Sequence, residues 1–199
     1  SVHIEALTGA VSALGHDVLI CGPEGVRRAG EISGSGPVSA AAAQQSHKAS
    51  WPFGLKEGAE WAYSYVGAQS LYAAAKAFQP DILYERYNLY YHAGAWVSRA
   101  LKIPLLMEVN APLAEERARH GQLTWRGAAD WSEARLWQAA DAVLPVSGVL
   151  RDRIMAKRVP EDRIHVVPNG VGEEALAPTD PGPVTDQYGL TGKLVLGFV

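Results

Sequence analysis

Cysteine is almost absent from this chain, and its scarcity excludes several kinds of site. Cys21 is the single cysteine among 199 residues, so the chain can form no internal disulfide and no structural zinc site built from several thiolates. A nearly cysteine-free composition is typical of proteins in a reducing compartment. Because no secretory signal peptide is evident either, we expect a soluble, cytoplasmic protein.

Long hydrophobic runs and an excess of positive charge are also lacking. The sequence has no apolar run long enough to predict a transmembrane helix, although peripheral contact with a membrane is left open. Lys and Arg number 18 against 21 Asp and Glu, which gives a formal net charge of -3. That balance provides no electrostatic basis for binding nucleic acid.

Complete motifs for nucleotide, metal or nucleophile sites are lacking too. The segment GSGPVS, residues 34–39, lacks the third glycine of a dinucleotide fingerprint, and GLTGKL, residues 189–194, lacks the Ser or Thr that follows the lysine of a phosphate loop. No G-x-S-x-G nucleophile elbow occurs. The six histidines show no metal-ligand spacing, so we predict no metal site.

The sequence does contain a regular alternation of strand-like and helix-like segments. Short runs of Val, Ile and Leu are separated by longer stretches with helical periodicity. This order is typical of a parallel sheet covered by helices on both faces, so we expect a Rossmann-like, doubly wound α/β fold. Expected strands cover residues 17–21, 82–86, 105–109, 141–147, 163–167 and 193–199, and expected helices cover 4–14, 56–78, 89–101, 113–140 and 147–157.

Glycine and aromatic residues add detail to two of the helices. The stretch 113–140 contains Gly121 and Gly127, either of which could break it. In the helix 56–78, a stripe of four residues at helical spacing predicts a packed core face rather than an aromatic binding surface. The stripe consists of Trp61, Tyr65, Ala68 and Tyr72. Residues 24–54, rich in Gly, Ala, Ser and Pro, are expected to form a long loop with one helical turn at 40–45.

The chain opens within a helix, where a doubly wound domain would open with its central strand. We therefore expect the first strand to be missing and the chain to be part of a longer protein. Residues 1–168 are expected to form one Rossmann-like domain, 169–192 a linker, and 193–199 the first strand of a second domain. The apolar segment 194–199, or a neighbouring chain, is a candidate to take the place of the missing strand.

Polar side chains gather where three of the expected strands end. Parallel strands bring their carboxyl ends to one edge of a sheet, and ligands of such sheets bind there. A helix start at the same edge favours an anion, so the edge suits a polyhydroxylated or phosphorylated ligand. Arg86 could instead do no more than pair with Glu85 or Glu108, and the residues leave both interpretations open. The strand-end residues are Tyr84, Glu85, Arg86, Glu108, Asn110 and Ser147.

Several segments together resemble the amino-terminal domain of family-4 glycosyltransferases, which have the GT-B fold. They are PDILYERYNLYYHAGAWVSRALKIPLLMEVNAPLAEE, AADAVLPVSGVLRDRI and PEDRIHVVPNGV. The resemblance implies two facing Rossmann-like domains that transfer a sugar, with retention, from a nucleotide-sugar donor to a sugar, lipid or small-molecule acceptor. It implies no cofactor and no required metal. It also implies that the catalytic residues and donor contacts lie mainly in the second domain, so this part alone is expected to be inactive.

The resemblance also assigns roles to individual residues. The strand end Tyr84, Glu85 and Arg86 matches a segment that tends to face the acceptor, and Glu108 lies on the neighbouring strand. Asn110 stands where many relatives have a histidine near the reacting sugar, and its amide can hydrogen-bond but cannot act as a general base. Four residues are expected at the cleft or hinge: His3, Ser147, Asn169 and Gly170. For His3, an exposed position at the helix start is the competing interpretation.

Two other classes of function remain open from the sequence. A nicotinamide-dependent oxidoreductase or epimerase of sugar nucleotides would need a glycine fingerprint, and an acidic residue at the end of its second strand. The strand 17–21 ends instead in Cys21 and Gly22, which weakens that reading. A non-catalytic Rossmann-like binding domain is the other alternative.

Overall fold

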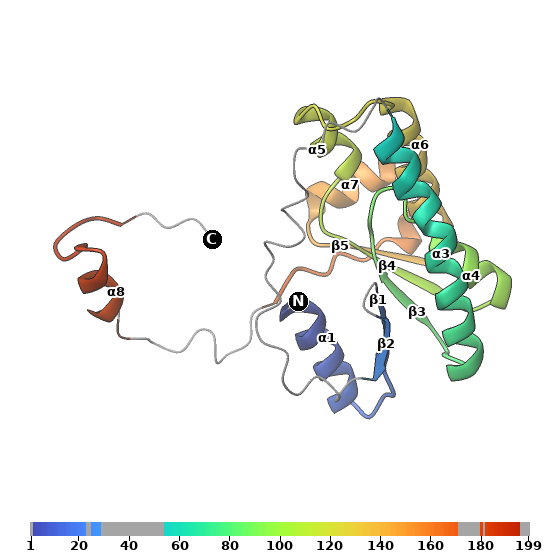
Figure 1. Ribbon diagram of the computed structural model, residues 1–199, viewed down its shortest axis with the longest axis horizontal. Helices are drawn as coiled ribbons and strands as arrows, with labels where there is room; N and C mark the ends of the chain where they lie inside the picture. The colour runs from blue at the N-terminus through green and yellow to red at the C-terminus, as the bar shows by residue number, and fades with distance from the viewer. Residues whose placement is uncertain (1, 23–24, 29–53, 171–179, 181, 196–199) are drawn as a thin grey trace. The chain divides into compact units, whose positions relative to one another are not determined.

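The computed structural model describes residues 2–22, 25–28, 54–170, 180 and 182–195 (Figure 1). The chain divides into two compact units, Ser1–Pro168 and Asn169–Val199. Among the described residues, the first unit contains a parallel sheet and most of the helices, and the second contains one short helix.

A three-stranded parallel sheet forms the centre of the first unit. The strands are β3 (Leu83–Arg86), β4 (Leu105–Val109) and β5 (Ala142–Pro145), in the order β3-β4-β5. Their apolar side chains supply the core, because Leu105, Met107 and Val143 have no exposed surface. The alternation of strands and helices in the sequence therefore correctly predicted an α/β fold.

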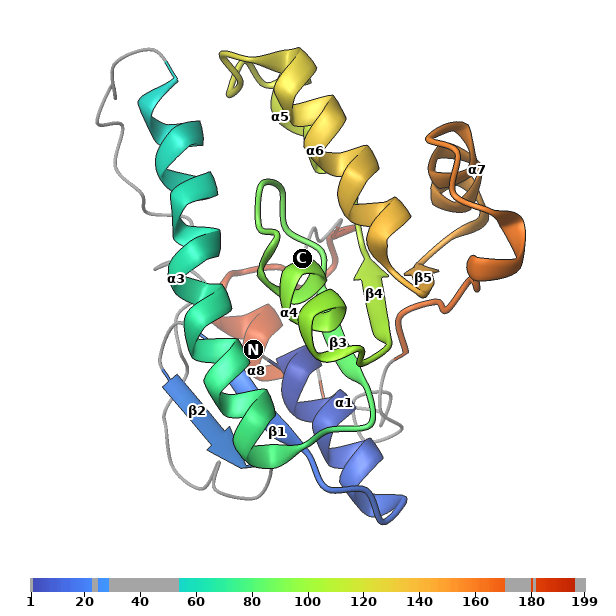
Figure 2. The same ribbon diagram turned by 90° about the vertical axis from the view of Figure 1, so that its right-hand side faces the viewer.

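Three helices lie side by side on one face of this sheet. They are α3 (Leu55–Phe78), α4 (Ala93–Leu101) and α6 (Arg126–Ala139), and Figure 2 shows them together in front of the strands. Leu136 and Trp137 of α6 are fully buried within the core. Two further helices follow strands directly: α5 (Leu113–Arg119) comes after β4, and α7 (Gly148–Ala156) comes after β5.

Several element boundaries differ from the predictions. Residues 87–92 form a loop rather than the start of α4, with Tyr90 in the left-handed region at φ 67°. The stretch 113–140 is broken around Gly121, which has φ 66°, whereas Gly127 lies inside α6. Glycine adopts a positive φ without steric cost, so the break falls at a residue that permits the turn.

The predicted strand 163–167 is only partly formed. A 3-10 turn covers Glu161–Arg163, and Ile164 forms an isolated parallel bridge with Val143. The backbone N–H groups of His165 and Val167 donate to the carbonyls of Val143 and Pro145, both at 2.9 Å. This segment therefore lies along β5 with some of the hydrogen bonds of a fourth strand.

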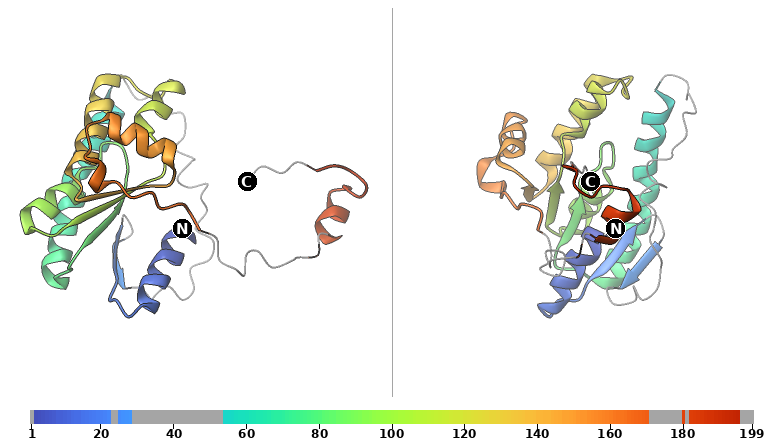
Figure 3. Two further views of the ribbon diagram at one scale, coloured as in Figure 1. Left: turned by 180° about the vertical axis from the view of Figure 1, so that it is seen from behind. Right: turned by 90° about the vertical axis from the view of Figure 1, so that its left-hand side faces the viewer.

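The amino-terminal region contains a hairpin that the sequence did not reveal. Helix α1 (Val2–Ala13) forms as expected, but β1 (Leu19–Gly22) pairs antiparallel with β2 (Gly25–Arg28) in a separate sheet. Figure 3 shows this hairpin beside α1. The prediction of a loop from residue 24 onward is thus wrong for 25–28, because β2 offers β1 a local partner. The turn predicted at 40–45 lies outside the described residues.

The aromatic stripe predicted to be buried on α3 is largely exposed. Trp61, Tyr65 and Tyr72 have 48%, 64% and 38% of their surface accessible, and the helix buries Ser64 and other small or polar residues instead. Small residues allow the close approach of neighbouring segments: a Cβ added at Gly67 would collide with the Tyr91 hydroxyl. Close packing at small side chains therefore set the orientation of α3, and the prediction of an aromatic core face was wrong.

The second unit also differs from expectation. The predicted linker contains a short helix, α8 (Gly182–Gln187). Residues 193–195 form no strand, and Leu194 is 93% exposed. The remainder of the expected strand, 196–199, lies outside the described residues, and no strand pairing includes the described residues 193–195. The idea that this segment completes a sheet therefore gains no support from the part that the structure describes.

Candidate functional site

The predicted strand-end residues divide between the two faces of the sheet. Successive side chains of a strand point to opposite faces, so Tyr84 and Arg86 share one face and Glu85 points to the other. Arg86 is the register neighbour of Glu108 on β4, which places Glu108 on the face of Tyr84. Glu85 points towards α4, since the backbone N–H of Gly94 donates to its carboxylate. The structure thus separates Glu85 from the rest of the predicted group.

Glu108 is the centre of the remaining group, which we call the polar edge: Tyr84, Arg86, Glu108 and Asn110. The Tyr84 hydroxyl donates to Oε2 of Glu108 at 2.7 Å, and the Asn110 amide donates to Oε1. Glu108 is only 5% exposed. Burial and the hydrogen bond to Glu108 both raise the pKa of Tyr84, so the phenol stays protonated and remains a donor.

Arg86 is paired with Glu108 but is not enclosed by that pair. Its Nε lies 3.9 Å from Oε1 of Glu108, and 51% of its side chain is exposed. Only the arginine of this pair is exposed, because the Glu108 side chain keeps 7% of its surface accessible, and at 3.9 Å the contact is at the edge of ion-pair range. The guanidinium carries five N–H donors in total, so Arg86 can contact a ligand without giving up its ion pair. The structure therefore shows a long ion pair between a half-exposed Arg86 and a buried Glu108, which is compatible with both interpretations left open by the sequence.

Glu85 instead serves the start of α4. The N–H of Gly94 donates to Oε2 at 3.0 Å, while Oε1 is buried without a hydrogen-bond partner. Burial raises the pKa of Glu85 to about 7, and the Gly94 hydrogen bond opposes the rise. A Cβ at position 94 would collide with this carboxylate. Glu85 therefore acts as a packed partner of α4, and its expected contact with an acceptor is not supported by its position.

Backbone bonds gather the strand ends at one edge. The N–H of Tyr87 donates to the carbonyl of Glu108 at 2.8 Å, and that of Val146 donates to Val109 at 3.2 Å. Ser147, two residues after the end of β5, accepts from the N–H of Leu150 at 3.3 Å. Ser147 is therefore the N-cap of α7, as its sequence position predicted.

The structure does not relate the other three predicted cleft or hinge residues to the polar edge. Asn169 and Gly170 open the second unit, and both are exposed. His3 lies in the first turn of α1, and its side chain falls outside the described residues. The roles assigned to these three residues stay predictions.

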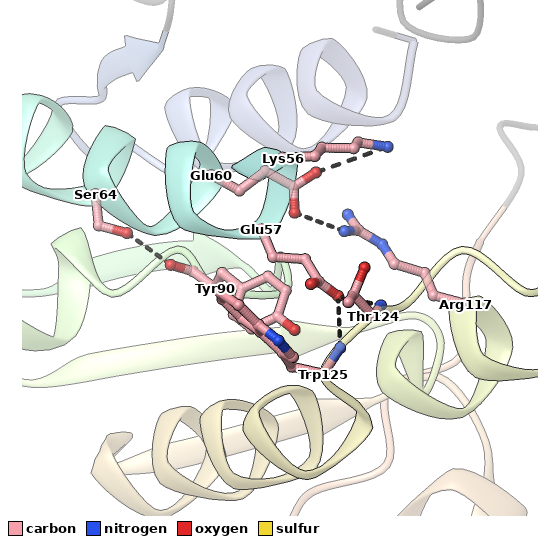
Figure 4. A network of polar contacts seen from close by, with 8 residues as sticks. All are labelled: Lys56, Glu57, Glu60, Ser64, Tyr90, Arg117, Thr124 and Trp125. Atoms are coloured by element: carbon pink, nitrogen blue, oxygen red, sulfur yellow. Dashed lines mark hydrogen bonds and ion pairs between the residues drawn. The ribbon is translucent and has the colours of Figure 1, made fainter. Parts of the chain in front are cut away.

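A second polar network was missed by the sequence analysis. It ties the start of α3 to the segment between α5 and α6, as Figure 4 shows. Oε1 of Glu57 accepts from the N–H of Thr124 at 2.9 Å, and Arg117 pairs with Glu60 at 2.7 Å. Burial, followed by the charge of Glu57, raises the pKa of Tyr90 to about 12.

The same network fixes the loop 87–92 that follows β3. The hydroxyl of Ser64 donates to the carbonyl of Tyr90 at 2.7 Å and accepts from the N–H of His92 at 3.0 Å. These contacts join residues 26 and 28 positions apart in the chain. No local sequence pattern predicts such a pairing, because α3 contains other polar and charged residues and nothing in the sequence marks Ser64 and Glu57 as the buried ones. The network holds the loop beyond Arg86 in place.

The arrangement suits hydrogen bonding to a polar ligand rather than metal chemistry. The polar edge offers a phenol, an amide and a guanidinium around one carboxylate, so it can exchange hydrogen bonds with hydroxyl groups in both directions. Within the residues that the structure describes, no three His, Cys, Asp or Glu side chains are grouped to hold a metal ion. Over the same residues, no helix has the length and apolar character needed to cross a membrane.

Comparison with known proteins gives a family and a distant relative. The family model described as Glycosyltransferase Family 4 matches residues 1–174. Alpha-maltose-1-phosphate synthase from Mycolicibacterium smegmatis (strain ATCC 700084 / mc(2)155) is 40% identical over 55 residues. That similarity covers 27% of this chain and 14% of the synthase, so the two share only a short segment.

Proposed function

This chain belongs to glycosyltransferase family 4, and we propose that it forms the amino-terminal, acceptor-binding half of a GT-B enzyme. The enzyme would transfer a sugar, with retention, from a nucleotide-sugar donor to a sugar, lipid or small-molecule acceptor, with no cofactor. A second domain would supply most donor contacts and the catalytic residues. The family favours this function over the nicotinamide-dependent reaction and the non-catalytic binding domain considered from the sequence.

The observation that carries the acceptor-side assignment is the polar edge. Glu108 is buried and holds Tyr84 and Asn110 by hydrogen bonds, while Arg86 stays half exposed beside it. Side chains fixed by their neighbours can orient a ligand at little entropic cost. In this proposal the edge orients an acceptor hydroxyl, and Asn110 contributes a hydrogen bond, since an amide cannot remove a proton.

Steady-state kinetics of the full-length protein would test this assignment. A screen of nucleotide-sugars by thermal shift first identifies the donor, because a ligand that binds the folded state raises its stability. The variant Arg86→Gln is then expected to raise the acceptor KM about tenfold or more, since hydrogen bonds to charged groups contribute ~1.5–3 kcal/mol. The donor KM should not change.

The matched control is Arg163→Gln, which removes an exposed arginine from the 3-10 turn. It should leave both KM values at their original level. An unchanged acceptor KM in Arg86→Gln, or an equal change in both variants, would show that the polar edge does not bind the acceptor.

A further inference from the structure

Three tryptophans from three different helices meet around a single histidine. The ring of His92 lies 5.8 Å from Trp96, 6.2 Å from Trp61 and 6.4 Å from Trp131. Trp61 and Trp131 also touch edge to face, with their ring centroids 6.3 Å apart. We call Trp61, Trp96 and Trp131 the tryptophan cluster; its members come from α3, α4 and α6, which lie side by side in Figure 2.

The histidine at the centre of the cluster is buried, whereas the three tryptophans around it are partly exposed to solvent. His92 is buried at 7% exposure and bonded to the hydroxyl of Ser132 at 2.9 Å. The three tryptophans nevertheless keep 48%, 42% and 53% of their surface exposed, in the order Trp61, Trp96, Trp131. Single exposed apolar residues need no explanation, but a contiguous apolar patch marks a surface that meets a partner.

Two unpaired cations flank the cluster. Arg99 follows Trp96 by three positions on α4, and Arg135 follows Trp131 by four positions on α6. Such spacings place side chains on the same face of a helix. Both arginines are exposed, and among the described residues neither has a carboxylate within ion-pair distance. The surface around the tryptophan cluster therefore combines half-exposed indole rings with two positive charges that have no ion-pair partner among the described residues.

Helix α3 extends the uncharged part of this surface. The fifteen residues from 61 to 75 contain no Asp, Glu, Lys or Arg. Tyr65, one turn after Trp61, is 64% exposed. Solvent-facing helix surfaces normally carry charged or polar residues, so this helix presents a surface that is ill suited to water alone.

We propose that the face formed by α3, α4 and α6 docks on the surface of an anionic lipid membrane. Tryptophan and tyrosine favour the boundary between headgroups and acyl chains, because each has an apolar ring and one polar group. Arginines beside them are attracted to anionic headgroups. Docking of this kind goes beyond glycosyl transfer and does not depend on it.

The form of the surface favours a membrane over a protein partner. Protein interfaces concentrate their binding energy in anchors that fill well-packed pockets. One cleft of the described residues lies at the end of α1 and another lies between α5, α6 and α7, and none of the three tryptophans lines either of them. A lipid surface needs no such pocket, because it accepts rings and charges on a broad face.

Vesicle co-sedimentation of the full-length protein tests the proposal. The protein is expected to bind vesicles of phosphatidylcholine mixed with phosphatidylglycerol and to remain in solution with phosphatidylcholine alone. The double variant Arg99→Gln/Arg135→Gln should bind the anionic vesicles roughly 30-fold more weakly, the factor expected for two basic residues near an anionic surface. The matched control Arg158→Gln/Arg163→Gln removes two exposed arginines that follow α7 and should bind as the unmodified protein does.

A second readout follows the rings themselves. Brominated lipids quench indoles that enter the bilayer boundary, so Trp131→Phe should reduce the quenching, whereas Trp137→Phe, at a fully buried position, should not. Absence of binding to anionic vesicles would overturn the proposal, and so would equal losses in the two arginine double variants. Concentration-dependent dimers that Trp131→Phe abolishes, without vesicle binding, would also overturn it and assign the face to a second copy of the chain.

Discussion

At the scale of single residues, Glu85 shows how one position in a strand changes a side chain's role. Tyr84 and Arg86 point to the polar edge, whereas Glu85 between them lies behind the sheet against α4. The sequence predicted all three as one strand end, and their spacing alone contained the information that separates them. The sequence did not indicate which of the two faces of β3 would be covered by a helix.

The buried position of Glu85 makes stability depend on pH. The pKa of Glu85 rises from 4.5 to about 7 in the folded chain. Between these two pH values the folded state therefore holds a proton that the unfolded state has already lost. The stabilisation is complete below about pH 4.5 and falls, by up to ~3 kcal/mol, as pH rises towards 7. In urea titrations at pH 5 and pH 8, Glu85→Gln should remove this part of the pH dependence. Parallel profiles for the two proteins would contradict the assignment.

At the scale of elements, small residues decide how helices sit on the sheet. Helix α3 was predicted to bury its aromatic stripe, yet it buries Ser64 and Ala75. A helix that is apolar on most sides does not specify which side packs, so the decision falls to the residues that permit the closest approach. Strand positions were more predictable, because β3, β4 and β5 each begin with apolar residues soon after a Pro or Asp that follows the preceding helix.

The contact between β3 and α4 depends on one such residue, Gly94. A side chain there would collide with the Glu85 carboxylate, so we expect Gly94→Ala to destabilise the chain by about 1–3 kcal/mol, the usual cost of overpacking. Gly58→Ala is the matched control. Gly58 also lies in a helix, nothing approaches its Cβ position, and alanine there should add up to about 1 kcal/mol through helix propensity. Chemical denaturation measures both, and equal effects would refute the packing argument.

At the scale of the whole molecule, local pattern and long-range contact contributed different information. The parallel α/β architecture followed from the order of segments, and the family from residues spread over most of the chain. The hairpin β1–β2 and the network around Glu57 and Ser64 did not follow. Each depends on partners that no periodicity marks, such as Thr124 for Glu57 and Tyr90 for Ser64.

The proposed separation of acceptor binding from donor binding and catalysis, in two domains, sets an expectation for activity. Transfer from a nucleotide-sugar requires charge stabilisation of the diphosphate that leaves, and the polar edge holds a single arginine, Arg86, already near Glu108. We therefore expect residues 1–199 alone to release no nucleoside diphosphate from any nucleotide-sugar, with or without acceptor, in a coupled assay. The full-length protein serves as the positive control. Turnover by residues 1–199 would place the catalytic machinery within this chain and would refute the division of labour proposed between the two halves.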